Sequence, residues 1–369
     1  MTSTAVSLGY YTYTSTPISC SASSIAGLEP CVAAVAGGPV GFYTYDGNYT
    51  GGNPGGFTDV VASHIGCPAH SQPTGNTCTC NDPYIPDSTG TSCVSEQYTL
   101  SLQTDPAQQI EPSGSARVIA KVINTLTGQP KEGVTVSIKI DVDVTSGGHD
   151  HGERIPPRPK GALSPATGTT GPDGTVSFNF GAPEVSGTHT FTASCVSPAC
   201  TNEGTARMDV KVDGLAPIPD DPTPYALVGG EADKQHHDNH YLTNSAFNQL
   251  VVLAINYHFL YPNEPVLHLN DASLVWGGLF DKDGDWDTPH EKHRRGVVID
   301  IRANMAPGNI PESLFTDFKA LAAKTQTTLA GRVISANAKL HCSDGFDPKN
   351  NCVGDNNRHF HVILLGVDQ

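Results

Sequence analysis

The chain has 369 residues, of which 37% are apolar, 7% aromatic and 16% charged, with a formal net charge of −16 when histidine is neutral. Its 38 glycines and 28 prolines exceed their usual combined share, which favours strands and turns and excludes coiled coils and long charged helices. The negative charge excludes a nucleic-acid partner, because a phosphate backbone would be repelled. No run of about 18 apolar residues occurs, so no transmembrane segment is expected.

The ten cysteines fall in close sequence pairs, without the double CxxC spacing of zinc thiolate sites. Disulfides formed in an oxidising compartment are therefore expected. The pairs are Cys20 with Cys31, Cys195 with Cys200, and Cys342 with Cys352, besides the group Cys67, Cys78, Cys80 and Cys93. The opening segment MTSTAVSLGYYTYTSTP lacks the basic and apolar regions of a signal peptide, which leaves the export route open. We expect a secreted protein, either extracellular, periplasmic or on the cell surface.

The N-terminal part of the chain predicts small disulfide-rich modules. Residues 1–66 are rich in Gly, Ser, Thr and Tyr and predict short irregular strands held by a Cys20–Cys31 disulfide. Residues 67–97 are too short and too polar to bury a core, so four cysteines take its place, in a pairing that the sequence leaves open. This segment resembles EGF-like modules in its CxC centre and in the turn before its last cysteine. A spacer held together by disulfides is expected rather than a ligand-binding module.

Residues 98–213 carry alternating, β-branched runs separated by turn residues, which predicts an antiparallel β-sandwich. The runs are QYTLSLQTD, SARVIAKVIN, GVTVSIKIDV, GTVSFNF, GTHTFTASC and ARMDVKVDG. The stretch TGTTGPDGTVSFNFGAPEVSGTHTFTASC resembles the end of a bacterial immunoglobulin-like (Big-type) domain, which implies a sandwich that holds another domain at a distance. His149 and His151 in the loop GGHDHGERIPPRPKG could bind a metal, although an exposed insertion with incidental histidines is the expected alternative.

Residues 214–229 are proline-rich and predict an extended, semi-rigid linker, and residues 230–369 mix helical and strand-like patterns. Helices are expected in NSAFNQLVVLAINYHFL, with Asn244 as N-cap, and in PESLFTDFKALAAKT, opened by Pro311. Strands are expected at PVLHL, GVVIDIRA, GRVISA and HFHVILLG. The chain is therefore expected to be multidomain, with a small disulfide-rich N-terminal region, an all-β immunoglobulin-like sandwich and a C-terminal α+β domain that buries its own core.

Two strand-borne motifs in the C-terminal domain predict a metal site. Asp300 is the one carboxylate in the apolar run GVVIDI, where its burial is costly unless a cation or a metal partners it. His293 lies seven residues earlier, in the turn that leads into this strand. His359 and His361 share one face of the strand HFHVILL, while Phe360 points to the other face. Two histidines and an aspartate leave a fourth position open for water, as in catalytic zinc sites.

These residues and their flanking segments resemble the ordered motifs of LAS-type metallopeptidases, the group that unites D-Ala-D-Ala carboxypeptidases, lysostaphin-type endopeptidases and the hedgehog zinc fold. The penicillin-insensitive murein endopeptidase branch has Asp-x-Ser-Leu-x-x-Gly-Gly, His-x-x-His-x-x-Gly-x-x-x-Asp and His-x-His motifs. They fall here on Asp271, Ser273, Leu274, Gly277 and Gly278, on His290, His293, Gly296 and Asp300, and on His359 and His361. One position departs from the pattern, because Asn356 stands where that branch tends to have a histidine.

The resemblance implies Zn²⁺ ligands at His293, Asp300 and His361. His359 would take the place of the catalytic base that carboxypeptidase relatives fill with glutamate, and His290 would line the catalytic site. Asp271 and Ser273 would contact the substrate.

Two further segments have roles that the sequence leaves open. DKDGDWD places Asp281, Asp283, Asp285 and Asp287 at alternate positions just before the zinc motif. It lacks the glycine and glutamate of an EF-hand loop, so a solvated acidic turn is expected, with a Ca²⁺ site as the alternative. HHDNHY could supply a substrate-facing histidine, with His240 the best candidate, or a helix cap through Asn239 or Asn244.

The leading hypothesis is a secreted zinc metallopeptidase that hydrolyses peptide bonds in peptidoglycan, as a murein endopeptidase or a D,D-carboxypeptidase does. Zinc would polarise the scissile carbonyl and lower the pKa of its bound water, and His359 would pass the proton of that water to the leaving amine. The alternative hypothesis is a cell-surface adhesion or recognition protein whose hedgehog-like zinc domain does not catalyse.

We predict a disulfide between Cys342 and Cys352. The residues SDGFDPKNN between them are polar and turn-forming, and the second cysteine lies shortly before the strand of His359 and His361. Closing a loop this short stabilises a fold by roughly 2–3 kcal/mol, and here it would also hold both histidines in position. Replacing both cysteines with serine should therefore lower turnover more than it lowers the melting temperature. Mass mapping that finds both thiols free in the secreted protein would contradict the prediction, as would a double mutant with undiminished activity.

Overall fold

The computed structural model describes most of the chain from residue 84 onward and shorter stretches before it. The described residues are 12–13, 43–46, 61–65, 67, 69–74, 77–82, 84–151, 157–229, 236, 238–281, 284–287, 291–342, 345–346 and 355–366. The chain divides into two compact units, Met1–Thr99 with Ile123–Lys131 and Leu100–Val122 with Glu132–Gln369.

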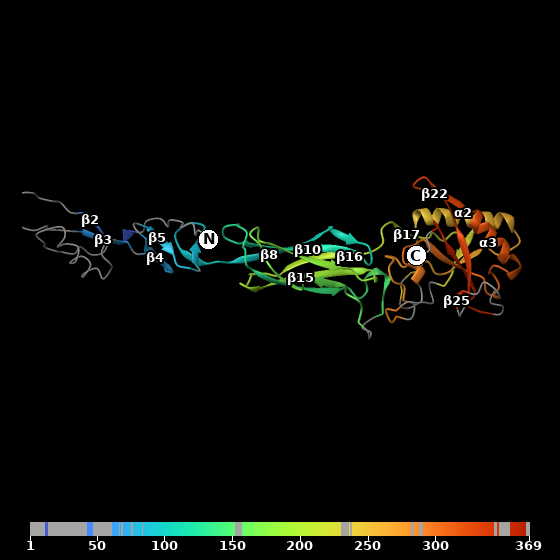
Figure 1. Ribbon diagram of the computed structural model, residues 1–369, viewed down its shortest axis with the longest axis horizontal. Coiled ribbons are helices and arrows are strands. Elements are labelled where there is room, and N and C mark those ends of the chain that lie inside the picture. Colours follow the sequence, from blue (N-terminus) through green and yellow to red (C-terminus); the bar gives the residue numbers. More distant parts are fainter. Residues whose placement is uncertain are drawn as a thin grey trace, which may run out of the picture. The chain divides into compact units, whose positions relative to one another are not determined.

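The described part of the first unit contains short strands (Figure 1) and two disulfides. One antiparallel sheet joins β1 (Thr12–Tyr13), β3 (Val61–Ile65) and β2 (Tyr43–Asp46). Two hairpins follow, β4 (Ser71–Thr74) with β5 (Thr77–Cys80) and β6 (Tyr84–Pro86) with β7 (Cys93–Ser95). The disulfides Cys67–Cys78 and Cys80–Cys93 settle the pairing that the sequence left open. Cys20 and Cys31 lie outside the described residues.

In the second unit, the alternating runs form a two-sheet β-sandwich of immunoglobulin-like architecture. Its elements are β8 (Tyr98–Asp105), β9 (Gln108–Ile110), β10 (Ser115–Asn124), β11 (Thr135–Val142), η1 (Ser146–Gly148), β12 (Ala162–Ser164), β13 (Thr167–Thr169), β14 (Thr175–Gly181), β15 (Gly187–Ser197) and β16 (Gly204–Val210). The sheet orders are β12-β14-β10-β8 and β13-β11-β15-β16-β9. Buried side chains of the two sheets meet, as in the edge-to-face contact of Phe180 with Phe191 at 5.0 Å between ring centroids. Cys195 and Cys200 form a disulfide where β15 ends.

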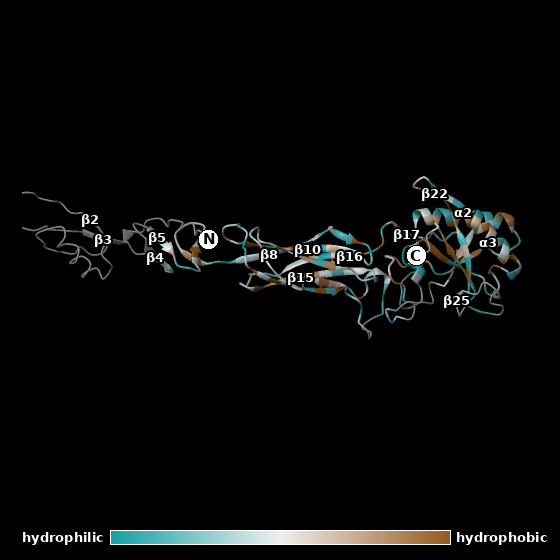
Figure 2. Ribbon diagram, in the orientation of Figure 1, coloured by the Kyte–Doolittle hydropathy of each residue, from teal (hydrophilic) through white to brown (hydrophobic). Residues whose placement is uncertain are grey.

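The C-terminal domain is built on a six-stranded sheet in the order β18-β20-β21-β26-β24-β25. Its strands are β18 (Tyr225–Leu227), β20 (Leu267–Leu269), β21 (Val298–Arg302), β24 (Asn337–Cys342), β25 (Gly345–Phe346) and β26 (His359–Ile363). The other elements are β17 (Leu215–Pro217), β19 (Tyr241–Thr243), α2 (Asn244–Leu260), η3 (Glu291–His293), η4 (Glu312–Leu314), α3 (Phe315–Lys324), β22 (Gln326–Leu329) and β23 (Arg332–Ser335). Figure 1 shows this domain with the helices α2 and α3. Both α-helices share one apolar core with the sheet, and Figure 2 shows hydrophobic residues concentrated there.

Helix α2 begins within a residue of its expected start, whereas the second helix begins as the 3₁₀ turn η4 after Pro311 and becomes α-helical at Phe315. Thr243, not Asn244, is the N-cap of α2, because its hydroxyl accepts a hydrogen bond from the backbone N–H of Ala246 at 3.3 Å. Pro311 is the N-cap of η4, which leads into α3. Among the described residues, no helix combines the length and the apolar character needed to cross a membrane.

Residues 214–229 differ from the free linker that their composition predicts. β17 pairs with β19, and β18 forms the edge of the six-stranded sheet beside β20. Ile218 and Tyr225 are buried in the core of the C-terminal domain. An edge strand tolerates prolines, because one row of its backbone groups has no ladder partner to lose. The segment is therefore part of the C-terminal domain.

The sandwich also contacts the C-terminal domain directly, whereas its resemblance implied a domain held at a distance. The backbone N–H of Leu279 donates to the carbonyl of Glu184, and that of Val212 donates to the carbonyl of Trp276, both at 2.9 Å. Gly278 lies at this junction with a φ of 76°, and a Cβ there would stand 2.6 Å from the Glu184 carbonyl oxygen. Only glycine allows this close approach without strain.

Gly278→Ala is expected to lower the free energy of unfolding more than Gly331→Ala does. Gly331 has a φ of 78° in the turn between β22 and β23, but a Cβ there would meet nothing within 4 Å. The control should cost about 1 kcal/mol through backbone strain alone, and Gly278→Ala about 1–3 kcal/mol more through overpacking. Denaturant unfolding of both variants measures the difference. Equal losses in the two variants would show that the junction is not closely packed.

Candidate metal centre

Strand register brings the expected ligands to one face of the central sheet. β21 and β26 are antiparallel neighbours, with Asp300 directly opposite His361. His359 lies two residues before His361 and shares its face. Phe360 points to the other face and packs against two phenylalanines of α3, with ring centroids 5.1 and 4.8 Å away. The polar residues are thereby separated from the helix side of the sheet.

His293 reaches the same point from η3. Its Nε2 atom lies 3.3 Å from Asp300 Oδ2, while His361 Nδ1 lies 3.0 Å from Asp300 Oδ1. His359 Nε2 lies 3.4 Å from Asp300 Oδ2. Gly296, at a φ of 64°, supplies the left-handed residue that lets the chain turn from His293 into β21.

Burial and charge shape the ionisation of this group in the absence of a metal. The side chains of His293, Asp300 and His361 expose 2%, 3% and 6% of their surface, and that of His359 exposes 26%. Burial opposes ionisation of Asp300, but the charges of His293 and His359 outweigh it and hold the pKa of this carboxyl well below its usual range. Burial lowers the pKa of His361, whereas at His293 the charge of Asp300 overcomes burial and raises the pKa.

The residues fit a divalent metal. Two imidazoles and a carboxylate are the ligand types of a three-ligand zinc site, and ligand atoms around Zn²⁺ at about 2.0–2.1 Å lie roughly 3.3 Å apart. His293 Nε2 lies 3.3 Å from Asp300 Oδ2, and His361 Nδ1 lies 3.0 Å from Asp300 Oδ1, so each histidine is near that spacing from one of the two carboxylate oxygens. These three buried residues could therefore hold a metal ion.

His341 is a neighbour of the site that the sequence analysis did not assign. It lies on β24 directly opposite His359 on β26, and its ring centroid is 5.8 Å from that of His359 and 5.0 Å from that of His361. Burial, and then the two neighbouring imidazoles, lower the pKa of His341 to about 4. The alternation of polar and apolar residues in NAKLHC indicates a strand. It does not indicate which strand pairs with this one, or that His341 would lie opposite His359.

Cys342 follows His341 at the end of β24 and is disulfide-bonded. Cys352 lies outside the described residues, so the Cys342–Cys352 pairing stays a prediction.

Asp271 and Ser273 are buried, and their contact with a substrate stays a prediction. The carboxylate of Asp271 accepts hydrogen bonds from the side-chain amides of Asn239 at 2.6 Å and Asn270 at 2.7 Å. Asn239 therefore supports Asp271 and does not cap a helix. His290 lies outside the described residues.

The described aspartates of DKDGDWD do not converge on one point. Asp281 is fully buried, and its carboxylate oxygens lie 3.5 Å from ring nitrogens of His149 and His151. These two histidines are thus buried, not exposed in an incidental insertion as expected. Asp285 and Asp287 are exposed, and Asp283 lies outside the described residues. A turn beginning at Asp281 directs the later carboxylates to solvent, which does not support the Ca²⁺ alternative.

Comparisons with known proteins add only distant likenesses. No protein-family model matches the chain, nor does any curated protein. The chain is similar to the solved structure of the Yersinia pseudotuberculosis adhesin InvE, with 14% identity and a TM-score of 0.25 over 47% of this chain and 48% of the adhesin. It is also similar to PapD-like domain 7 of human CEP192, with 12% identity and a TM-score of 0.16 over 30% of this chain and 81% of that domain. The chain thus spans about half the length of the adhesin, and likenesses at these TM-scores do not bear on function.

His240 is held by two contacts that occupy both of its ring nitrogens. Nδ1–H donates to Asp238 Oδ1 at 3.1 Å, and Nε2–H donates to the Val228 carbonyl at 3.2 Å. Both ring nitrogens therefore have partners within the protein, and the substrate-facing role expected for His240 stays a prediction. Burial alone would lower the pKa of His240, but the hydrogen bond and charge of Asp238 outweigh burial and raise it above 6.5.

His240→Gln should destabilise the protein in a pH-dependent way. Because the pKa of His240 is higher folded than unfolded, its contribution is fully present below the unfolded pKa and is lost as the pH rises through the folded value. We expect the variant to lose about 1 kcal/mol of unfolding free energy at about pH 6 and less at about pH 9. Urea unfolding at both pH values measures this, with His258→Gln on the exposed side of α2 as control. A loss that is the same at both pH values would refute the charged pair.

Proposed function

We propose that the C-terminal domain is a zinc-dependent peptidase that hydrolyses peptide bonds in peptidoglycan, and that the protein is secreted. The observation that carries the proposal is the convergence of His293, Asp300 and His361, with the partly exposed His359 beside them. The order and spacing of the motifs, which resemble those of murein endopeptidases, support the substrate class. The disulfides support an oxidising compartment.

His293, Asp300 and His361 would hold the zinc. When bound there, zinc supplies Lewis-acid chemistry, which polarises a scissile carbonyl and acidifies a water molecule. The protein contributes a carboxylate that stays ionised across the neutral range, since the pKa of Asp300 is well below its usual value after the charges of His293 and His359 overcome burial. Pairing of β21 with β26 fixes Asp300 and His361 relative to each other before any ligand arrives.

The contacts of His359 support a role in proton transfer. Its Nδ1 atom lies 2.7 Å from the carbonyl oxygen of Asn357. A carbonyl oxygen can only accept, so Nδ1 carries the proton and Nε2 carries the lone pair in neutral His359. Nε2 faces the ligand group, 3.4 Å from Asp300 Oδ2. In this tautomer Nε2 can take a proton from an attacking water and return it to the leaving amine.

Arg358 fixes the beginning of the strand that carries this histidine. Its buried guanidinium donates from Nε to the Ala303 carbonyl at 2.8 Å and from Nη1 to Glu312 at 3.1 Å. It also lies over the ring of Phe315, 4.7 Å from the ring centroid. These contacts join β26 to the end of β21 and to α3, so they hold the backbone next to His359 in place.

His359→Ala should abolish turnover without removing the metal. General acid–base catalysis contributes about 10²–10⁴-fold, so we expect kcat on purified murein to fall by about that factor, with zinc content unchanged. His361→Ala should lose both activity and one zinc ion, and a chelator should inactivate the wild type. Digestion products identified by mass name the bond that is cleaved. The exposed His258→Ala on α2 is the matched control and should leave kcat unchanged.

Two results would contradict the peptidase proposal. One is a purified chain without zinc whose digestion of murein is unaffected by chelator. The other is a chain that binds zinc and cell walls but releases no peptide, with the same wall affinity in His359→Ala. That second result would favour a recognition protein whose zinc domain does not catalyse.

A further inference from the structure

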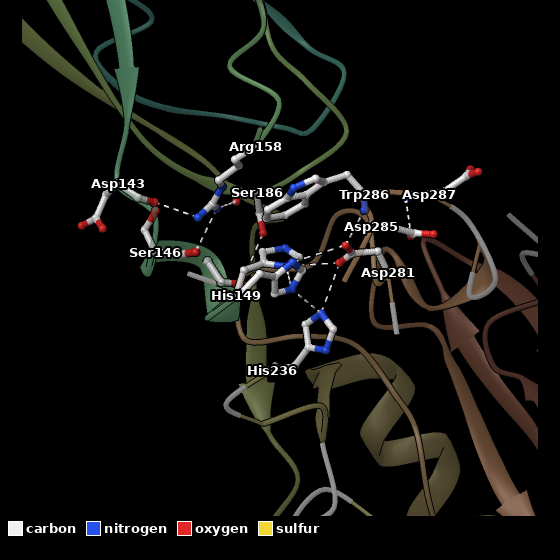
Figure 3. A network of polar contacts seen from close by, with 12 residues as sticks. Asp143, Ser146, His149, Arg158, Ser186, His236, Asp281, Asp285, Trp286 and Asp287 are labelled. Carbon is white, nitrogen blue, oxygen red and sulfur yellow. Dashed lines mark hydrogen bonds and ion pairs between the residues drawn. The ribbon is translucent and has the colours of Figure 1, made fainter. Parts of the chain in front are cut away.

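A second group of metal-binding side chains lies where the sandwich meets the C-terminal domain (Figure 3). His149 and His151 come from the sandwich loop after η1, and His236 and Asp281 come from the C-terminal domain. An isolated β-bridge between His149 and His236 joins the two segments. All four side chains are buried, with 0% to 5% of each residue exposed.

The ligand atoms of this group are spaced like the corners of a tetrahedron. His151 Nε2 lies 3.4 Å from His149 Nδ1 and 3.1 Å from His236 Nε2. Asp281 Oδ1 lies 3.2 Å from His236 Nε2 and 3.5 Å from His149 Nδ1. Ligand atoms around Zn²⁺ at about 2.0–2.1 Å are roughly 3.3 Å apart, so four of the six edges of the tetrahedron have the length that zinc requires.

Contacts outside the group hold its ligands in place. The backbone N–H of Trp286 donates to Asp281 Oδ2 at 2.8 Å, and Oδ1 is the oxygen next to His236 and His149. The indole ring of Trp286 stacks on His151, with centroids 4.3 Å apart. Arg158 donates to two backbone carbonyls at the start of the histidine loop, at 2.7 and 2.9 Å, and so fixes that loop (Figure 3). Such supporting contacts orient the ligands of metal sites.

Ring nitrogens of three histidines converge on one another, and lone pairs that meet repel unless a proton or a metal lies between them. His151 Nε2 faces both His149 Nδ1 and His236 Nε2. A metal ion at the centre of the group would accept the converging lone pairs together.

We propose that His149, His151, His236 and Asp281 form a second divalent-metal site of the zinc class, with four protein ligands. A closed set of four is typical of structural zinc, while a catalytic site keeps one position open. Since two ligands belong to the sandwich and two to the C-terminal domain, the metal fastens one to the other. The site shares no ligand with the candidate catalytic group and does not require that group to be active.

A shared aromatic ring connects the second site to the first. Phe280, which precedes Asp281, lies edge-on to His236 with ring centroids 4.9 Å apart. The same ring lies 6.4 Å from His293, a ligand of the candidate catalytic group. Loss of the second metal is therefore expected to loosen the packing against His293.

Metal content of single variants of the full chain tests the proposal. We expect two zinc ions per wild-type chain after removal of metal and reloading with Zn²⁺ alone, one in His236→Ala and one in His361→Ala. The exposed His258→Ala should keep two. If the wild type holds one zinc that only His361→Ala loses, the second site does not exist. If the one zinc is lost only in His236→Ala, the second site stands and the proposed peptidase fails.

Asp281→Asn is a second variant, in case His236→Ala fails to fold. Asparagine keeps the size of the aspartate side chain and an oxygen that can accept the hydrogen bond from the Trp286 N–H. Circular dichroism should match the wild type, while competition with a chromophoric chelator should show zinc affinity at one of two sites reduced by about tenfold or more. Zinc should also raise the melting temperature of the wild type more than that of Asp281→Asn. A folded Asp281→Asn protein that binds two zinc ions with unchanged affinity would overturn the proposal.

Discussion

The pairing of β21 with β26 is the constraint on which the candidate catalytic group depends. It sets Asp300 opposite His361, and it is held on the other face of the sheet by the packing of Phe360 against α3. Side chains alternate along a strand, so a slip of one residue would turn the histidines toward the helices and the phenylalanine toward the site. Burying ionised groups among the phenylalanines of α3 is costly, and this cost excludes the slipped register. Hydrophobic packing on one face thus determines polar geometry on the other.

The two candidate ligand groups differ in the number of their residues and in their exposure. The group on β21 and β26 has three residues that could hold a metal, and its neighbour His359 keeps about a quarter of its side chain exposed. The group at the junction has four such residues, and all four are buried. With Phe280 between His236 and His293, packing around one group is continuous with packing around the other. The sandwich therefore contributes to the C-terminal domain as a packed neighbour, not as a spacer.

The sequence by itself determined the features that depend on residues close together in the chain. Period-two alternation located the strands of the sandwich and the strand of His359 and His361, because side chains i and i+2 share a face whatever the strand pairs with. One carboxylate in an apolar run marked Asp300, since its burial demands a partner. The start of α2 was found to within one residue, because capping is local, whereas Pro311 opens a 3₁₀ turn and α3 itself begins at Phe315. The contact between Asp300 and His361 could not be predicted from local pattern, because it depends on the register of two strands that are far apart in the sequence.

Only the tertiary structure decided the features that depend on which distant segments meet. His341 lies beside the site because β24 pairs with β26, and the sequence NAKLHC does not indicate which strand it pairs with. His149 and His151 have the composition of a polar insertion, and they are buried because His236 and Asp281 come to them from another part of the chain. Residues 214–229 look like a linker, yet they supply β17, which pairs with β19, and β18, which pairs with β20 at the edge of the six-stranded sheet. Composition and local period fix what a segment can become, whereas long-range pairing and burial select where it lies.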